Sequence, residues 1–285
     1  MDLFAGLQEV LRRALVAKGV GSLTFRAGEQ PLHYYRASGS GLGPPVLLVH
    51  GLGGSANGFY RLFDGLKRRF RAIYAPDLPG HGFSPLPLSG PNRLEEQMEL
   101  LSRFAREVVG APTLLVGNSL GGAMSIRLAA SSPGSVVGLV LVAPAGALWS
   151  KSRLMELERA MLVRTAAEAR ELTRRLFHKP PLPLMLFGSE LRKMYGTPAV
   201  HAAFAEAREL GHIPGEILAS LRAPTLVLWG KSDRLLPPES VDYFRAHLPQ
   251  GSKVEVVPRF GHVPQVERPR EVVQRIVRFA DEHRL

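Results

Sequence analysis

The chain of 285 residues contains no cysteine, which excludes disulfide bonds, thiol catalysis and cysteine–metal sites. The same absence leaves the redox compartment undetermined. No apolar run is long enough to cross a bilayer. The N-terminus carries Asp2 and has no continuous apolar stretch of the kind found in secretory signals. These absences make a cytoplasmic location the default expectation.

Signatures of nucleic-acid binding are also missing, although the formal net charge is +11. The basic side chains are scattered along the chain, and the densest cluster is only Lys67, Arg68, Arg69 and Arg71. No zinc-ligand spacing, RNA-binding signature or basic zipper accompanies them. We therefore expect a solvated basic surface and no nucleic-acid partner.

Cofactor motifs are absent as well. No cluster of metal-ligating residues stands out, and the glycines of residues 51–54 lack the Gly-x-Gly-x-x-Gly register of a dinucleotide site. The sequence therefore predicts no cofactor and no metal.

The strongest motif present is Gly-x-Ser-x-Gly at residues 117–121. An apolar, β-rich run precedes it, and residues 123–130 have a helical composition. This strand–turn–helix context predicts a strained turn that projects the hydroxyl of Ser119 above a sheet. Gly117 and Gly121 would let the strand and the helix pass closely. Ser119 is the candidate nucleophile.

Apolar runs and helical periodicity alternate along most of the chain. Strands are predicted at residues 22–26, 31–36, 46–49, 70–75, 113–116, 136–142, 225–229 and 253–257, and helices at 58–69, 93–109, 239–247 and 269–282. This alternation predicts an α/β fold with a mostly parallel, eight-stranded sheet and helices on both faces.

The alternation stops between residues 147 and 220. Helices are predicted at 153–177 and 198–210, and a proline-interrupted apolar stretch lies between them at 179–187. We interpret residues 147–220 as a helical lid inserted into a core of residues 21–146 and 221–285. Its apolar side chains either line an acyl or aromatic pocket or pack the lid onto the core.

An amphipathic helix is predicted in residues 1–20. Apolar side chains recur at helical spacing from Leu3 to Leu15, with Arg12, Arg13 and Lys18 elsewhere on the helix. Packing on the domain is one explanation. A weak membrane-surface contact through residues 3–18, or a dimer contact, is the alternative, because a basic amphipathic helix also suits an interface.

Three reactive side chains follow predicted strands: Ser119, Asp233 and His262. The carboxyl ends of parallel strands form the ligand-binding edge of an open α/β sheet. The histidine would act as general base and the aspartate would orient it. Asp64 and Glu239 are weaker candidates for the acid, because neither follows a buried strand.

An oxyanion intermediate needs two preorganised N–H donors. We expect the backbone amides of Leu120, next to the nucleophile, and of Leu52, in the glycine-rich loop at residues 51–54. For His50, Asp77 and His81 we expect hydrogen bonds that shape loops rather than a catalytic role.

With these motifs and the order Ser, Asp, His, the sequence resembles the α/β-hydrolase superfamily over nearly its whole length. The matching segments are residues 50–54, 77–82, 117–122, 229–233 and 261–262. The resemblance implies a serine hydrolase, because the branches that cleave haloalkanes and epoxides use aspartate at the position of Ser119. The resemblance is specific for the fold and the catalytic residues, and much less specific for the substrate.

The favoured activity is hydrolysis of a small, apolar carboxylic ester, as in a carboxylesterase, by a monomer or homodimer. The Gly-Asn-Ser-x-Gly-Gly sequence at residues 117–122 also resembles carbon–carbon bond hydrolases that act on meta-ring-fission diketo acids. Those usually carry tryptophan after the catalytic histidine, where this chain has Val263, and a lid arginine for the substrate carboxylate. Arg174, Arg175 and Arg192 are available. A catalytically inactive binding protein of the same fold is the alternative from another class.

Overall fold

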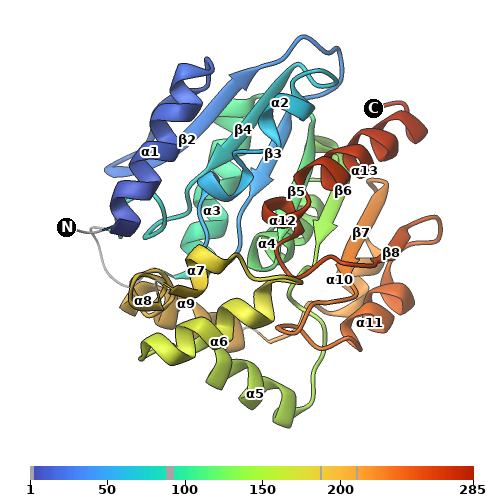
Figure 1. Cartoon of the computed structure of the whole chain (residues 1–285). Helices are drawn as coiled ribbons and strands as arrows, with labels where there is room; N and C mark the ends of the chain where they lie inside the picture. Colours follow the sequence, from blue (N-terminus) through green and yellow to red (C-terminus); the bar gives the residue numbers. More distant parts are fainter. Residues whose placement is uncertain (1–2, 88–92, 187, 210) are drawn as a thin grey trace.

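The computed structural model describes residues 3–87, 93–186, 188–209 and 211–285. Within these residues, one sheet of eight strands has the order β1-β2-β4-β3-β5-β6-β7-β8 (Figure 1). The strands are β1 (Gly21–Ala27), β2 (Gln30–Ser38), β3 (Val46–Val49), β4 (Ala72–Pro76), β5 (Thr113–Asn118), β6 (Val136–Val142), β7 (Thr225–Gly230) and β8 (Lys253–Val257). β2 is antiparallel to β1 and β4, and all other pairs are parallel. The predicted fold class is confirmed.

Helices cover both faces of the sheet, because successive strand residues point to opposite sides. In β3, Leu47 and Val49 belong to the core cluster beneath α3 (Leu94–Phe104), α4 (Leu120–Ser131) and α11 (Ser240–His247). Val46 and Leu48 belong to the cluster beneath α2 (Phe63–Leu66) and α13 (Pro269–Glu282). Figure 1 shows α2 and α13 in front of the sheet and α3 and α4 behind it.

The N-terminal helix α1 (Leu3–Ala17) confirms the predicted amphipathic helix. Leu15 is buried in the same core cluster as α2 and α13, so α1 packs on the domain as expected. Val10 is 61% exposed on the outer side. Contact of this helix with a membrane surface or with a second copy stays a prediction.

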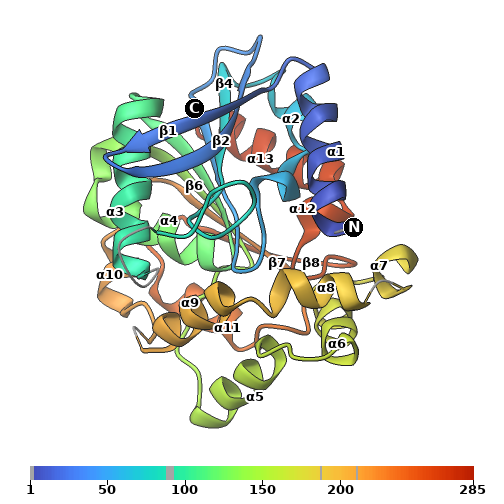
Figure 2. The ribbon, with the colours of Figure 1, turned by 90° about the vertical axis from the view of Figure 1, so that its left-hand side faces the viewer.

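Helices α5 to α10 lie between β6 and β7 in the chain, and we call these helices and their connections the helical insertion. Figure 2 shows it below the sheet, with α8 close beneath α1. Its helices are α5 (Lys151–Met161), α6 (Ala166–Leu176), α7 (Leu182–Leu186), α8 (Gly188–Tyr195), α9 (Pro198–Glu209) and α10 (Gly215–Ala219).

The prediction of one helix across residues 153–177 is wrong in one respect, because the helix is broken between α5 and α6. Thr165 caps α6: its hydroxyl accepts a hydrogen bond from the amide of Glu168, whose carboxylate accepts one from the amide of Thr165. This reciprocal capping box starts a new helix. Helix α8 was also missed, because prolines interrupt the sequence before it.

Smaller differences occur elsewhere. The predicted helix at residues 58–69 is only the short turns η1 (Ala56–Phe59) and α2. The last turn of the predicted 93–109 helix is wound more widely, as η2 (Ala105–Val109), and ends at Gly110 with a φ of 63°. A positive φ favours glycine and ends the helix there. A short turn, η3 (Pro133–Ser135), precedes β6, and α12 (Pro264–Glu267) follows β8.

No helix among the described residues combines the length and the apolar composition that a membrane span requires.

Candidate active site

Ser119 lies at the sharp turn between β5 and α4. Its φ of 55° and ψ of −118° are a rare conformation for a residue other than glycine. Two backbone hydrogen bonds hold the turn: the Ser119 amide donates to the Val142 carbonyl at 3.0 Å, and the Ala145 amide donates to the Ser119 carbonyl at 3.0 Å. The strained turn predicted at Ser119 is confirmed.

The glycines on either side of Ser119 permit the close approach expected of them. A β-carbon placed on Gly117 would lie 2.4 Å from the carbonyl oxygen of Gly121. One placed on Gly121 would lie 2.2 Å from the carbonyl oxygen of Val49, at the end of β3. Neither position has room for a side chain, so helix α4 can start directly against the strands.

His262 and Asp233 form a buried pair. The loop after β7 carries Asp233, and the loop after β8 carries His262. Nδ1 of His262 lies 2.8 Å from Oδ2 of Asp233, and both side chains are at most 3% exposed. The other carboxylate oxygen accepts hydrogen bonds from the amides of Leu235 and Leu236 at 2.9 and 3.1 Å. The aspartate is therefore fixed, and Nε2 of His262 is the nitrogen left for proton transfer.

The alternative acids do not approach this histidine. Asp64 is exposed and pairs with Lys18 at 2.9 Å, and Glu239 pairs with Arg153 at 3.1 Å. Asp233 alone of the three carboxylates contacts His262, as the sequence favoured.

The glycine-rich loop after β3 lies against the nucleophile. A β-carbon on Gly51 would be 3.0 Å from that of Ser119. The next amide is that of Leu52, whose side chain is half-buried. Leu120 is the first residue of α4, so its amide lies at the positive end of the helix dipole. The two amides predicted for an oxyanion therefore come from segments that meet at Ser119.

His50 and His81 join this loop to the one after β4. Nε2 of His50 accepts a hydrogen bond from the amide of Leu78 at 2.9 Å, and its Nδ1 donates to the Gly51 carbonyl at 2.8 Å. Nε2 of His81 accepts from the amide of Gly53 at 3.2 Å. Burial lowers the pKa of both imidazoles, that of His81 to about 4. Both rings are neutral hydrogen-bonding groups, which agrees with the loop-shaping role expected of them.

Asp77 shapes the neighbouring loop. Its carboxylate accepts hydrogen bonds from the amides of Ala56 at 2.6 Å and Phe83 at 3.0 Å, and pairs with Nδ1 of His33 at 2.7 Å. Nε2 of His33 lies 2.8 Å from Oγ of Ser22. Ser22, His33 and Asp77 therefore form a hydrogen-bonded chain of their own, but none of these three residues lines the cavity described next.

Ser119 and His262 open into a cavity of about 680 Å³. A large part of its wall comes from apolar side chains of the helical insertion, including Leu157, Met161, Leu172, Leu176, Phe177, Leu191, Met194 and Phe204. Leu7, Gln8 and Leu11 of α1 line it as well. Most of these side chains of the insertion also belong to the core cluster, so the two roles left open for the apolar residues of 147–220 occur together. The contribution of α1 was not predicted.

Asn118 is a site residue that sequence reasoning missed. Its Nδ2 donates to the carbonyls of Val142 and His262, both at 3.0 Å. Its Oδ1 accepts from Nε2 of Gln265 at 3.0 Å. The side chain beside the nucleophile therefore holds the backbone of the histidine loop, across 144 positions of sequence.

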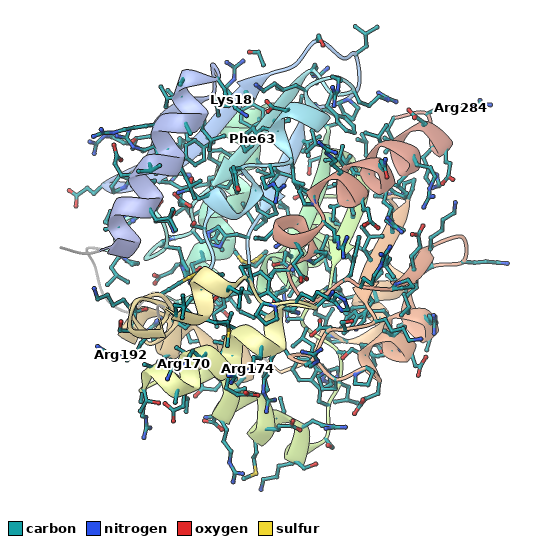
Figure 3. All side chains as sticks on the ribbon, in the orientation of Figure 1. Lys18, Phe63, Arg170, Arg174, Arg192 and Arg284 are labelled. Carbon is teal, nitrogen blue, oxygen red and sulfur yellow. The ribbon has the colours of Figure 1, made fainter. Side chains whose placement is uncertain are left out.

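The arginine at the cavity is also not one of those considered from the sequence. Figure 3 labels Arg174 and Arg192 on α6 and α8 of the insertion. Neither they nor Arg175 line the cavity, whereas Arg208 of α9 does. Its guanidinium already pairs with Glu158 at 2.7 Å.

The alpha/beta hydrolase family model matches residues 46–275, so the chain belongs to this family. It is similar to Lipase 1 of Psychrobacter immobilis, with 32% identity over 258 residues that cover 87% of this chain and 80% of the relative. Together with the family match, such lipase relatives identify the chain as a hydrolase of this fold.

Solved structures agree with this assignment. A membrane phospholipase A, described as a bacterial virulence factor, superposes with a TM-score of 0.86 and 31% identity, covering 100% of this chain and 93% of that one. The 2-hydroxy-6-oxo-6-phenylhexa-2,4-dienoate hydrolase of a Rhodococcus strain has a TM-score of 0.77 and 24% identity, covering 91% and 98%. The second likeness supports the fold alone.

Proposed function

We propose that the protein is a serine hydrolase that cleaves carboxylic esters with an apolar acyl group. The observation that carries this proposal is the buried His262–Asp233 pair, whose histidine lines the same apolar cavity as the strained Ser119. A serine hydroxyl is a weak nucleophile at neutral pH and needs such a base beside it. The lipase relatives support the ester as substrate.

In the proposed reaction, Oγ of Ser119 attacks the ester carbonyl while Nε2 of His262 takes its proton. Asp233 stabilises the imidazolium that forms. The negative oxygen accepts hydrogen bonds from the amides of Leu52 and Leu120. His262 then gives its proton to the departing alkoxide, which leaves an acyl group on Ser119. A water that gives a proton to His262 then attacks the acyl carbonyl. His262 returns this proton to Oγ of Ser119 as the carboxylic acid leaves.

The helical insertion would act as the lid of this site. Its side chains form a large part of the cavity wall, so a bound acyl group would be covered by α6 and α8. Burying each methylene contributes about 0.8 kcal/mol, which is why an apolar cavity favours a longer acyl chain.

The test is kcat/KM on p-nitrophenyl esters of increasing acyl length, with Ser119→Ala beside the native protein. We expect a preferred chain length and a loss of about 10⁴-fold or more in kcat for Ser119→Ala. Ser22→Ala is the matched control, because Ser22 is hydrogen-bonded to the His33–Asp77 pair but does not line the cavity. Activity that survives Ser119→Ala would contradict the mechanism.

Carbon–carbon bond hydrolysis is the second candidate. It is favoured by the Gly-Asn-Ser-x-Gly-Gly sequence and by the presence of one arginine, Arg208, at the cavity. The ion pair between Arg208 and Glu158 weakens this candidate, because the guanidinium is already neutralised. Feeble turnover of every ester, with turnover of a dienoate ring-fission product, would favour it. Failure of a fluorophosphonate to label Ser119 would instead indicate an inactive binding protein.

A further inference from the structure

One segment of the helical insertion touches both loops that carry the histidine and the aspartate. We call residues 174–179, at the end of α6 and just after it, the clamp segment. The carbonyl of Leu176 accepts a hydrogen bond from the amide of His262 at 2.7 Å. The carbonyls of Arg174 and Arg175 accept from Nη1 and the amide of Arg234, at 3.0 and 3.2 Å. Arg234 directly follows Asp233.

Side chains add two further connections. Nδ1 of His178 lies 2.8 Å from Oγ of Ser232, the residue before Asp233. The carboxylate of Glu267, at the end of α12, accepts a hydrogen bond from the amide of Gly261 at 3.0 Å and one from the amide of Lys179 at 3.1 Å. Glu267 therefore ties the histidine loop to the clamp segment with both of its oxygens.

Gly261 shows how closely the two segments approach. A β-carbon at this position would lie 2.5 Å from the carbonyl oxygen of Leu176 and 2.7 Å from the amide nitrogen of His178. Only glycine leaves room for the clamp segment beside His262. The hydrogen bonds therefore belong to a tight contact between two backbones.

The same segment also faces the substrate cavity. Leu176 and Phe177 line the cavity, and both are buried. The backbone of Leu176 therefore holds His262, while its side chain forms part of the wall that an acyl group would touch.

We propose that the clamp segment and Glu267 position the His262–Asp233 pair for proton transfer. A bound acyl group, by packing on Leu176 and Phe177, holds the segment and hence the pair in the reactive arrangement. This inference rests on the proposed ester hydrolysis. Glu267 is a positioning residue in this account, because it acts through Gly261 and Lys179 and contacts no reacting atom.

The test compares Glu267→Ala and Glu267→Gln with the native protein on the p-nitrophenyl esters of butanoate and dodecanoate. Misplacing a catalytic group by a fraction of an ångström is costly, so we expect kcat on butanoate to fall about tenfold or more in Glu267→Ala, with KM changed by less than about twofold. The loss on dodecanoate should be smaller, because its chain packs on Leu176 and Phe177. The kcat of Glu267→Gln should lie between that of the native protein and that of Glu267→Ala, since the glutamine amide keeps only one acceptor oxygen.

Controls separate positioning from a general loss of structure. Glu282→Gln removes a carboxylate that pairs with Lys253 on the surface, and it should leave both esters unaffected. The melting temperature and the rate of Ser119 labelling by a fluorophosphonate are measured for each variant, and the labelling rate should fall with kcat. If Glu267→Ala does not fold, His178→Phe removes the bond to Ser232 and keeps an aromatic ring at this position.

Unchanged kcat and labelling rate in a folded Glu267→Ala or His178→Phe protein would overturn the positioning role. If kcat fell by the same factor on the short and the long ester, the acyl group would not help to hold the clamp segment, and that part of the proposal would be overturned. A native protein that labels with the fluorophosphonate but hydrolyses no ester would instead overturn the proposed function, and the labelling rates of the variants would still test the positioning role.

Discussion

At the scale of single residues, Gly121 shows why the nucleophile turn depends on backbone contact. The first turn of α4 lies so near the end of β3 that a methyl group on Gly121 would meet the carbonyl oxygens of Val49 and His50 at 2.2 and 2.5 Å. Backbone atoms on both sides cannot move aside as a flexible side chain could. The approach also brings the glycine-rich loop, which begins at Gly51, to Ser119.

Gly121→Ala should therefore destabilise the protein by about 3 kcal/mol and lower ester turnover, because overpacking must displace backbone. Urea denaturation measures the change in the free energy of unfolding. Gly134→Ala is the control, since nothing lies within 4 Å of a β-carbon there, and its effect should stay within about 0.5 kcal/mol. If the two substitutions changed the free energy of unfolding equally, the close backbone contact at Gly121 would not be the cause of the destabilisation.

Single residues also show what the sequence can predict about the site. Ser119, Asp233 and His262 were predicted because each comes within a few residues of the end of a predicted strand, which is a local signal. The hydrogen bond from Asn118 to the carbonyl of His262 was not found, because it joins positions 144 residues apart and leaves no local pattern. Glu267 and Arg208 were missed for the same reason.

At the scale of elements, α1 is more than a covering helix. Leu7, Gln8 and Leu11 line the cavity, and Nδ2 of Asn57 in η1 donates to the Gln8 carbonyl at 3.2 Å. Helix α1 also contacts α8 of the insertion. Helix α1 therefore forms one wall of the cavity and contacts both η1 and helix α8 of the insertion.

Leu11→Trp should shorten the cavity and shift the preference toward short acyl chains. We expect the ratio of kcat/KM for dodecanoate to that for butanoate to fall about tenfold, since a few methylenes then lose their apolar contact. Val10→Trp lies on the exposed side of the same helix and should leave the ratio unchanged. A ratio unaffected by Leu11→Trp would mean that the acyl chain does not reach α1.

The elements of the core could be predicted well, and those of the insertion less so. Strands β3, β6 and β8 have the predicted bounds. For β3 and β6 the reason is that buried parallel strands are short apolar runs between turns. In the insertion, periodicity continued across the break between α5 and α6, and only the pairing of Thr165 with Glu168 marked it. Prolines before α8 concealed a helix whose stability comes from packing against α6 and α1.

At the scale of the whole molecule, buried histidines couple stability to pH. Burial, and then the nearby His50, lower the pKa of His81 from 6.5 to about 4, and burial lowers that of His50. The unfolded chain binds these protons at higher pH than the folded protein does. The free energy of unfolding is therefore highest above pH 6.5, where these histidines are neutral in both states. It decreases as the pH falls toward 4, because the unfolded chain takes up the protons first.

His81 alone should reduce the free energy of unfolding by on the order of 2 kcal/mol between neutral pH and about pH 5. Urea denaturation across this range measures the slope. His81→Gln keeps a donor and an acceptor for the Pro79 carbonyl and the Gly53 amide, and it should flatten the slope even if it lowers stability overall. An unchanged slope in His81→Gln would assign the pH dependence to other groups.

The order of the strands also matters while the protein is being made. Ser119 and the glycine-rich loop belong to the first half of the chain, whereas Asp233 and His262 follow β7 and β8, which come last in sequence and end the sheet. A growing chain on the ribosome therefore exposes its serine well before the proposed base has been translated. On the proposed mechanism, ester hydrolysis begins only when the final strand joins the sheet, and unfinished chains cannot attack the lipids and esters around them.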